Sequence, residues 1–187
     1  MGTTTAVAGA YRGAEDAAPS GVQAGQWVAD SPEETAVVFL IGMRINRWRR
    51  VRSWWPAFVG MPRMLAELGK HPEAGLLGAR SYWSGRNLLT VQYWRSAEQL
   101  GRYARDPQRA HQPAWGRHNR RAAATGDVGV WHESYVVPAA SIESLYANMP
   151  AFGLGAALGA VPRAQARRTR AQELIGGPAG DPVTDGR

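Results

Sequence analysis

The run Thr35–Ile45 constrains the fold more than any other part of this chain, because it reads as a strand that is apolar on both faces. Positions 37, 39, 41 and 43 hold Val, Phe, Ile and Met, and positions 38 and 40 hold Val and Leu. Successive side chains of a strand point to opposite faces of its sheet. The sheet built on this strand therefore needs a cover on each face, and one layer of helices provides only one of the two.

The segments that follow predict the element order β-α-β-β-α-β. Hydrophobic periodicity, turn residues and helix breakers place a helix over Trp54–His71, strands over Gly75–Trp83 and Leu88–Trp94, helical segments from Ser96 through His118, a strand over Gly129–Val137 and a short helix over Ser141–Asn148. This order is that of a ferredoxin-like α+β fold, with a four-stranded antiparallel sheet and its helices on one side. The same sheet from a second subunit would cover the other side, so we expect a homodimer.

The chain of 187 residues is long enough for one domain with a substantial core. We expect this domain to span residues 33–155. Residues 1–32 and 156–187 are rich in Gly, Ala, Pro and polar side chains and show little apolar periodicity. They are interpreted as a flexible N-terminal arm and a flexible basic C-terminal tail.

Composition excludes several classes of site and partner. The chain has no cysteine, which rules out disulfide scaffolds, thiolate metal sites and cysteine nucleophiles. No run approaches the roughly 20 apolar residues of a membrane helix, and the first residues lack a signal-peptide pattern. We therefore expect a cytoplasmic protein with no membrane partner. No glycine-rich phosphate loop or dinucleotide fingerprint stands between a strand and a helix, so no flavin or nicotinamide site is expected.

The net charge of +7 raises the question of nucleic-acid binding. The densest basic cluster, Arg44–Arg52, has tryptophans interleaved with its arginines, as in surfaces that bind phosphates and stack on bases. No pattern of a nucleic-acid-binding module accompanies this cluster. We therefore interpret it as a segment anchored to the domain by its tryptophans, and we expect no nucleic-acid partner.

The strand Gly129–Val137 places an imidazole, a carboxylate and a phenol close together in the sequence, at His132, Glu133 and Tyr135. Strand alternation separates them. His132 shares a face with valines and should point toward the helix-covered side, where it could act as a general base, ligate a haem, or remain a core histidine bonded to a backbone carbonyl. Glu133 and Tyr135 should face the dimer partner or pair with an arginine such as Arg44.

Seven stretches between residues 35 and 155 form a pattern known from one protein superfamily. They are Ile41–Asn46, Trp55–Pro56 with Met64–Leu68, Gly75–Gly78, Tyr93–Ser96, His111 with Trp115, Trp131–Tyr135 and Tyr146–Pro150. Together they resemble the dimeric α+β-barrel superfamily that includes the antibiotic-biosynthesis monooxygenases. The closer resemblance is to a monooxygenase-like family, first described as a domain of unknown function and related to a fumagillin-pathway monooxygenase.

The resemblance implies a cavity between the helices and the sheet. His132 and His111 are the candidate catalytic bases, since the helix that carries His111 would border this cavity. Arg44 and Asn46 alternate onto one face at the end of the first strand, where they could bind a carbonyl or enolate oxygen or seal the barrel rim. The candidate substrate-binding residues are Trp115, Met61, Met64, Trp55 and Tyr93. The spacing of the histidines lacks a chelating pattern, so no metal site is expected.

We therefore expect a small dimeric oxygenase-like enzyme that acts on a hydrophobic small molecule, of the kind found in specialised (secondary) metabolism. Proton abstraction would precede addition of O₂, without any cofactor. Two alternatives remain open, because the superfamily also includes haem enzymes and non-catalytic members. One is a haem-dependent, aldoxime-dehydratase-like enzyme in which His132 or His111 ligates the haem. The other is a non-catalytic ligand-binding or dimerisation module.

Overall fold

The structure, a computed structural model, describes residues 18–30, 34–106 and 125–166. The chain forms two compact units. The central unit spans Glu33–Ala139, and the flanking unit is built from the segments on either side of it, Met1–Pro32 and Ala140–Arg187. The candidate site lies in the central unit.

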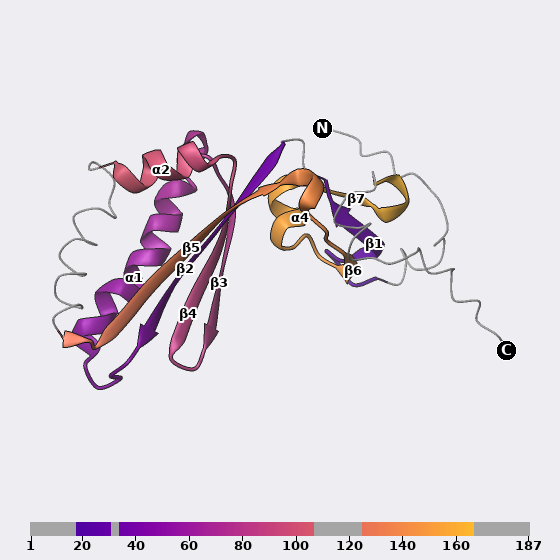
Figure 1. Cartoon of the computed structure of the whole chain (residues 1–187). Coiled ribbons are helices and arrows are strands. Elements are labelled where there is room, and N and C mark those ends of the chain that lie inside the picture. The colour runs from indigo at the N-terminus through magenta and orange to yellow at the C-terminus, as the bar shows by residue number, and fades with distance from the viewer. Residues whose placement is uncertain (1–17, 31–33, 107–124, 167–187) are drawn as a thin grey trace. The chain divides into compact units, whose positions relative to one another are not determined.

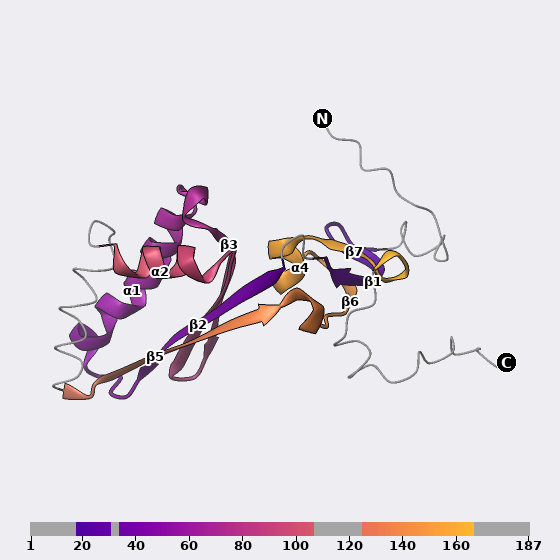
Figure 2. The same ribbon diagram turned by 45° about the horizontal axis from the view of Figure 1, so that its top comes forward.

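The central unit has the predicted order β-α-β-β-α-β. Its elements are β2 (Thr35–Ile45), α1 (Val51–Leu68), the 3₁₀ turn Pro72–Ala74, β3 (Leu76–Ser84), β4 (Asn87–Trp94), α2 (Ala97–Arg105) and β5 (Val128–Pro138). The four strands form one antiparallel sheet in the order β3-β4-β2-β5. Both helices lie on the same side of this sheet (Figure 1, Figure 2). The ferredoxin-like α+β arrangement expected from the sequence is confirmed.

The core of the central unit forms where helix-facing strand residues meet α1 and α2. Two groups of buried side chains lie there: Val37, Met64, Leu68, Trp94 and Tyr103 form one, and Met43, Ile45, Trp54 and Val128 form the other. The residues of β2 in these groups come from the two ends of the strand. Between them, Phe39 and Ile41 face the same side and are only partly buried. The helix side of the sheet is therefore filled at its ends and less completely in the middle.

The opposite face of the sheet is also apolar, as the alternation predicts. Val38 and Leu40 of β2 and Leu89 of β4 are partly exposed there. Trp131 and Tyr135 of β5 keep 41% and 47% of their surface exposed. Neither α1 nor α2 covers this face (Figure 2).

The flanking unit differs from the expected arm and tail. It contains β1 (Gln23–Ala29), β6 (Tyr146–Met149), α4 (Gly153–Leu158) and β7 (Ala160–Pro162), with short 3₁₀ turns at Ala139–Ser141 and Arg163–Gln165. The three strands form a sheet in the order β6-β1-β7. The helix expected over residues 141–148 is wrong, because residues 146–149 pair with β1 instead. The sheet takes strands from both ends of the chain, so the boundaries expected at residues 32 and 155 do not describe this unit.

Candidate functional site

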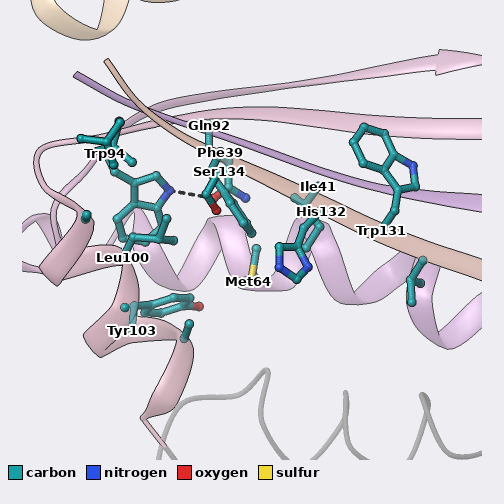
Figure 3. A pocket seen from close by; sticks show the side chains of 16 residues that line it. Phe39, Ile41, Met64, Gln92, Trp94, Leu100, Tyr103, Trp131, His132 and Ser134 are labelled. Atoms are coloured by element: carbon teal, nitrogen blue, oxygen red, sulfur yellow. Dashed lines mark hydrogen bonds between the residues drawn. The ribbon is translucent and has the colours of Figure 1, made fainter. Parts of the chain in front are cut away.

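A cavity of about 630 Å³ lies on the helix side of the sheet in the central unit. Its walls come from β2, β4 and β5, from Met64 of α1, and from α2. Figure 3 shows His132, Met64 and Tyr103 around the same space. Most of the lining is apolar, and Gln92 and Ser134 add an amide and a hydroxyl. This volume is within the range of small-molecule sites, roughly 300–1,000 Å³.

His132 reaches the pocket because of the alternation of β5. Val130 and Ser134, two residues away on either side, line the same pocket. In the register of β5 with β2, His132 lies opposite Ile41. Its ring centroid is 5.7 Å from that of Phe39, with the ring planes at 42°. The prediction that His132 faces the helix-covered side is confirmed, and its chemical role stays a prediction.

The carboxylate and the phenol next to His132 in the sequence do not join it. The hydroxyl of Tyr135 donates a hydrogen bond of 2.6 Å to Glu133 Oε2, and this bond raises the pKa of the phenol above its ordinary value. Neither residue lines the pocket. The indole of Trp131, which also contributes to the lining, leaves β5 on the side opposite the imidazole (Figure 3). Within the described part of the chain, the candidate base is therefore the imidazole of His132, and the Glu133 carboxylate does not lie beside it in the pocket.

Gln92 of β4 is a polar pocket residue that we did not predict from the sequence. Its side chain is fully buried, and its Oε1 accepts a hydrogen bond of 2.9 Å from the indole N–H of Trp94 (Figure 3). That donor fixes which end of the amide is the oxygen. The amide nitrogen then lies 3.8 Å from Sδ of Met61, a weak acceptor. The sequence could have identified Gln92, because strand alternation places it on the same face as Trp94 and Leu88, at a core position.

Arg44 and Asn46 bond to residues at the end of the sheet and not to His132, and their expected role in holding the substrate's oxygen stays a prediction. The Arg44 guanidinium donates to Asn87 Oδ1 at 3.1 Å, and the Asn46 amide donates to the carbonyl oxygen of Gly126 at 3.0 Å. Both side chains are exposed. Alternation puts Arg44 on the sheet face opposite the imidazole, and Asn46 follows the last residue of β2. They close the end of the sheet, which was the other interpretation of this pair.

The residues proposed to bind substrate separate into different places. Met64 lines the pocket and is buried. Met61 lies next to Gln92 and lines a neighbouring cavity. Trp55 is half exposed and stacks on Phe58 with 5.5 Å between ring centroids. Alternation turns Tyr93 to the opposite sheet face. His111 and Trp115 lie outside the described residues, so their role stays a prediction.

Asp127, a residue that we did not select from the sequence, binds the basic cluster Arg44–Arg52 through Arg47. Asp127 is buried and accepts hydrogen bonds from Ser53 Oγ at 2.8 Å and from the Arg47 guanidinium at 3.0 Å. The hydrogen bond from Ser53, followed by the bond and charge of Arg47, holds the pKa of this carboxyl below its ordinary value. The indole of Trp54, which follows the cluster in α1, is buried and donates to the backbone oxygen of Trp48 inside the cluster.

Two kinds of feature are missing from the part of the chain that the structure describes. No three His, Asp or Glu side chains of residues 18–30, 34–106 and 125–166 come together as metal ligands would. None of the helices in these ranges is long and apolar enough to cross a lipid bilayer.

The solved structures that are similar to this chain include the following two. One is an aldoxime dehydratase (OxdRE) in complex with butyraldoxime, at 19% identity and a TM-score of 0.51, covering 74% of this chain and 38% of that one. The other is a conserved protein of unknown function from Bacteroides thetaiotaomicron, described as a possible oxidoreductase, at 13% identity and a TM-score of 0.38, covering 56% of this chain and 99% of that one. The first likeness concerns the fold, and this chain spans little more than a third of the aldoxime dehydratase.

No curated relative matches the chain. The chain does match a protein family described as "Monooxygenase af470-like", over residues 36–154. This match includes every strand of the central sheet and both helices that cover it. Because it covers more than half of the 187 residues, the chain belongs to the Monooxygenase af470-like family.

Proposed function

We propose that the protein is a small oxygenase-like enzyme that acts on a hydrophobic molecule bound between the sheet and helices α1 and α2. The observation that carries this proposal is the position of His132. Among the described residues it is the one imidazole in the lining of an otherwise largely apolar pocket. Membership of a monooxygenase-like family supports an oxidative reaction.

In the proposed reaction His132 removes a proton from the substrate. Imidazole is the side chain most often used as a general base, and the substrate proton would come from a C–H beside a carbonyl or from a phenol. The remaining anion is electron-rich enough to react with O₂. For a CH₂ group oxidised to a carbonyl, the substrate supplies all the electrons, one oxygen atom enters the product and the other leaves as water. The protein contributes positioning and proton transfer.

Gln92 and Ser134 take the role first assigned to Arg44 and Asn46. Gln92 has its Oε1 held by Trp94, so its amide nitrogen is the end that would donate to a ligand, exchanging its contact with the weak acceptor Met61 Sδ for a ligand oxygen. Ser134 lies two residues from His132 on the same face of β5 and lines the same pocket. Hydrogen-bond donors placed at a developing oxyanion stabilise it most when water is excluded.

The test substitutes His132→Asn and measures O₂ uptake with a panel of hydrophobic phenols and 1,3-diketones. We expect the rate to fall by about 10²- to 10⁴-fold, the usual contribution of a positioned base, while quenching of tryptophan fluorescence by the same compounds persists. His71→Asn is the matched control, because His71 contacts Glu73 outside the pocket. An O₂ uptake rate that His132→Asn leaves unchanged would remove His132 from the mechanism.

Haem is the alternative occupant, with His132 as its ligand. An imidazole on an apolar wall suits that role, and haem would supply redox chemistry when bound. Among the described residues that line the pocket there is no arginine or lysine to pair with the haem carboxylates. A neutral hydrophobic ligand fits this lining better. A Soret band that appears on haemin titration and is lost in His132→Asn would favour the haem enzyme instead.

A non-catalytic binding module remains the alternative from a different class of protein. It predicts that hydrophobic compounds quench tryptophan fluorescence while no compound of the panel stimulates O₂ uptake. The same measurements on the wild-type protein therefore separate the two proposals.

A further inference from the structure

A second cavity, of about 310 Å³, lies beside the pocket in the central unit. It is bounded by the first half of α1, by β2 and by the β3–β4 hairpin; its lining includes Ala57, Phe58, Met61, Ser81, Trp83 and Thr90. Like the first cavity it is largely apolar. Neither the expected substrate-binding set nor the proposed reaction assigns it a role.

A thin partition separates the two cavities. Ile41 lines both of them. Met61 belongs to the second cavity and Gln92 to the first, and Met61 Sδ is 3.8 Å from Gln92 Nε2. One shared strand residue and one contact between a helix side chain and a strand side chain therefore lie where the two cavities adjoin.

Met61 is the part of this partition that can move. Methionine is unbranched and has several rotatable bonds, so it adapts to different cavity shapes. The residues on either side of it weaken the helix: Pro62 has no N–H to donate to the carbonyl oxygen of Phe58, and Gly60 has a low helix propensity. A Cβ on Gly60 would have no heavy atom within 4 Å, so no packing requires a glycine there.

The second cavity carries one polar feature. The hydroxyls of Ser81 and Thr90 are 2.8 Å apart and hydrogen-bonded to each other, and Thr90 is buried. Two paired hydroxyls hold one hydrogen between them and leave lone pairs and one further O–H for a ligand. The cavity therefore suits an alkyl or ring segment that bears at most one hydroxyl or carbonyl oxygen.

We propose that the second cavity is a subsite for the apolar tail of the ligand whose reacting end lies at His132, with Met61 as the residue that determines which tail lengths fit. The placement of the reacting end rests on the proposed function. The substrate class is then an elongated hydrophobic molecule with its acidic C–H or phenol at one end, longer than the first pocket alone would accept.

A chain-length series of 4-alkylphenols tests the subsite through binding alone. In the wild type we expect about fourfold tighter binding for each added methylene, continuing until both cavities are filled. Ala57→Phe, which fills only the second cavity, should end this gain at a shorter chain and leave the shortest phenols unaffected. Ala104→Phe, which fills only the first cavity, should weaken every member of the series. Met61→Ala should improve binding of the longer chains most.

The subsite is overturned if Ala57→Phe leaves the dependence on chain length unchanged while circular dichroism shows a folded protein. If the phenylalanine variant does not fold, Ala57→Leu replaces it in the experiment. The gain in binding should then also end at a shorter alkyl chain than in the wild type, by a smaller difference. Loss of O₂ uptake is not a readout of this experiment. A failed base assignment at His132 would therefore leave the chain-length result intact, and a failed subsite would leave the His132 result intact.

Discussion

Asp127 fixes the start of α1 to the first residues of β5. Its carboxylate binds Ser53 and Arg47, and its backbone oxygen accepts the N–H groups of Asn46 and Arg47. One residue thus joins the end of β2, the loop after it and the first turn of α1. The Phe58 and Met61 positions that bound the second cavity depend on how this helix begins.

Replacement of Asp127 should give a stability difference that depends on pH. Its pKa is lowered in the folded protein, so the carboxylate stabilises the fold above the unfolded-state value, and this contribution is lost as the pH falls toward the folded-state pKa. We expect Asp127→Asn to lower the Tm at pH 7, and the gap to wild type to narrow below the ordinary value of 3.8. Thermal denaturation between pH 2.5 and 7 measures this, with exposed Asp30→Asn as control. A gap that stays constant over the range contradicts the assignment.

Two glycines should respond to alanine in opposite directions. At Gly42 a Cβ would lie 2.6 Å from ring atoms of Trp131 and 2.8 Å from the backbone oxygen of Leu88. Backbone cannot move aside as a side chain can, so Gly42→Ala should cost about 1–3 kcal/mol of unfolding free energy. Gly60→Ala should instead stabilise by about 0.5–1 kcal/mol, because the site in α1 is open and alanine favours helix. Urea denaturation of both variants measures the two signs, and equal signs would contradict the argument.

Helix α2 begins directly after Ser96, whose side chain caps it. Ser96 Oγ accepts a hydrogen bond of 3.1 Å from the backbone N–H of Gln99, and the helix starts at Ala97. The Gln99 amide, which a capping box would return to the Ser96 backbone, donates instead to the backbone oxygen of Glu73. Ser96 therefore marks the start of the helix. The contact with Glu73 replaces the second hydrogen bond that a capping box would make.

Loss of this cap should destabilise the helix that forms one wall of the pocket. We expect Ser96→Ala to lower the free energy of unfolding by about 1 kcal/mol. Ser96→Asp keeps an oxygen acceptor at the same position and should restore most of the loss. Urea denaturation gives the values, and an alanine variant as stable as the aspartate variant would show that the Ser96 bond contributes little.

Helix α1 shows how local and tertiary effects combine within one element. It begins at Val51, earlier than the Trp54 start expected from periodicity, and it contains Pro56 and Pro62. Pro56 lies in the second turn and Pro62 in the interior, where a backbone hydrogen bond is lost. Packing of Trp54, Met64 and Leu68 against the sheet maintains the helix despite this loss, as burial commonly overrides propensity.

At the scale of the whole molecule, we propose a homodimer formed through the sheet face that the helices leave open. Val38, Leu40, Trp131 and Tyr135 supply its apolar side chains. An exposed apolar face of this kind is typical of an interface. The second sheet would complete the barrel that the family resemblance implies.

The dimer predicts a sedimentation result. We expect the wild type to sediment as a dimer at micromolar concentration and Leu40→Glu to shift it to monomer, because the substitution would place a charge in the apolar interface. Val51→Glu introduces the same charge at an exposed residue outside that face and should leave the dimer intact. A monomeric wild type would refute the proposal.

Much of the fold and one part of the site were predictable from the sequence. Strand alternation predicted which side of the sheet His132 faces. The same rule, applied to β4, would have identified Gln92. Where Arg44 and Asn46 lie was not predictable, because a shared strand end does not determine which pocket a side chain reaches. Hydrogen bonds to Asn87 and Gly126, distant in sequence, decide where those two side chains lie.

The sequence by itself determined the features that depend on neighbouring residues: the order of elements in the central unit, the two apolar faces of β2 and the side of β5 that carries His132. These follow from side-chain periodicity and local hydrogen bonding, which act within one element. Only the tertiary structure decided that β1 pairs with β6 and β7, and that two cavities meet at Met61 and Gln92. Contacts between segments far apart in the chain determine those features, and no periodicity within a single segment encodes them.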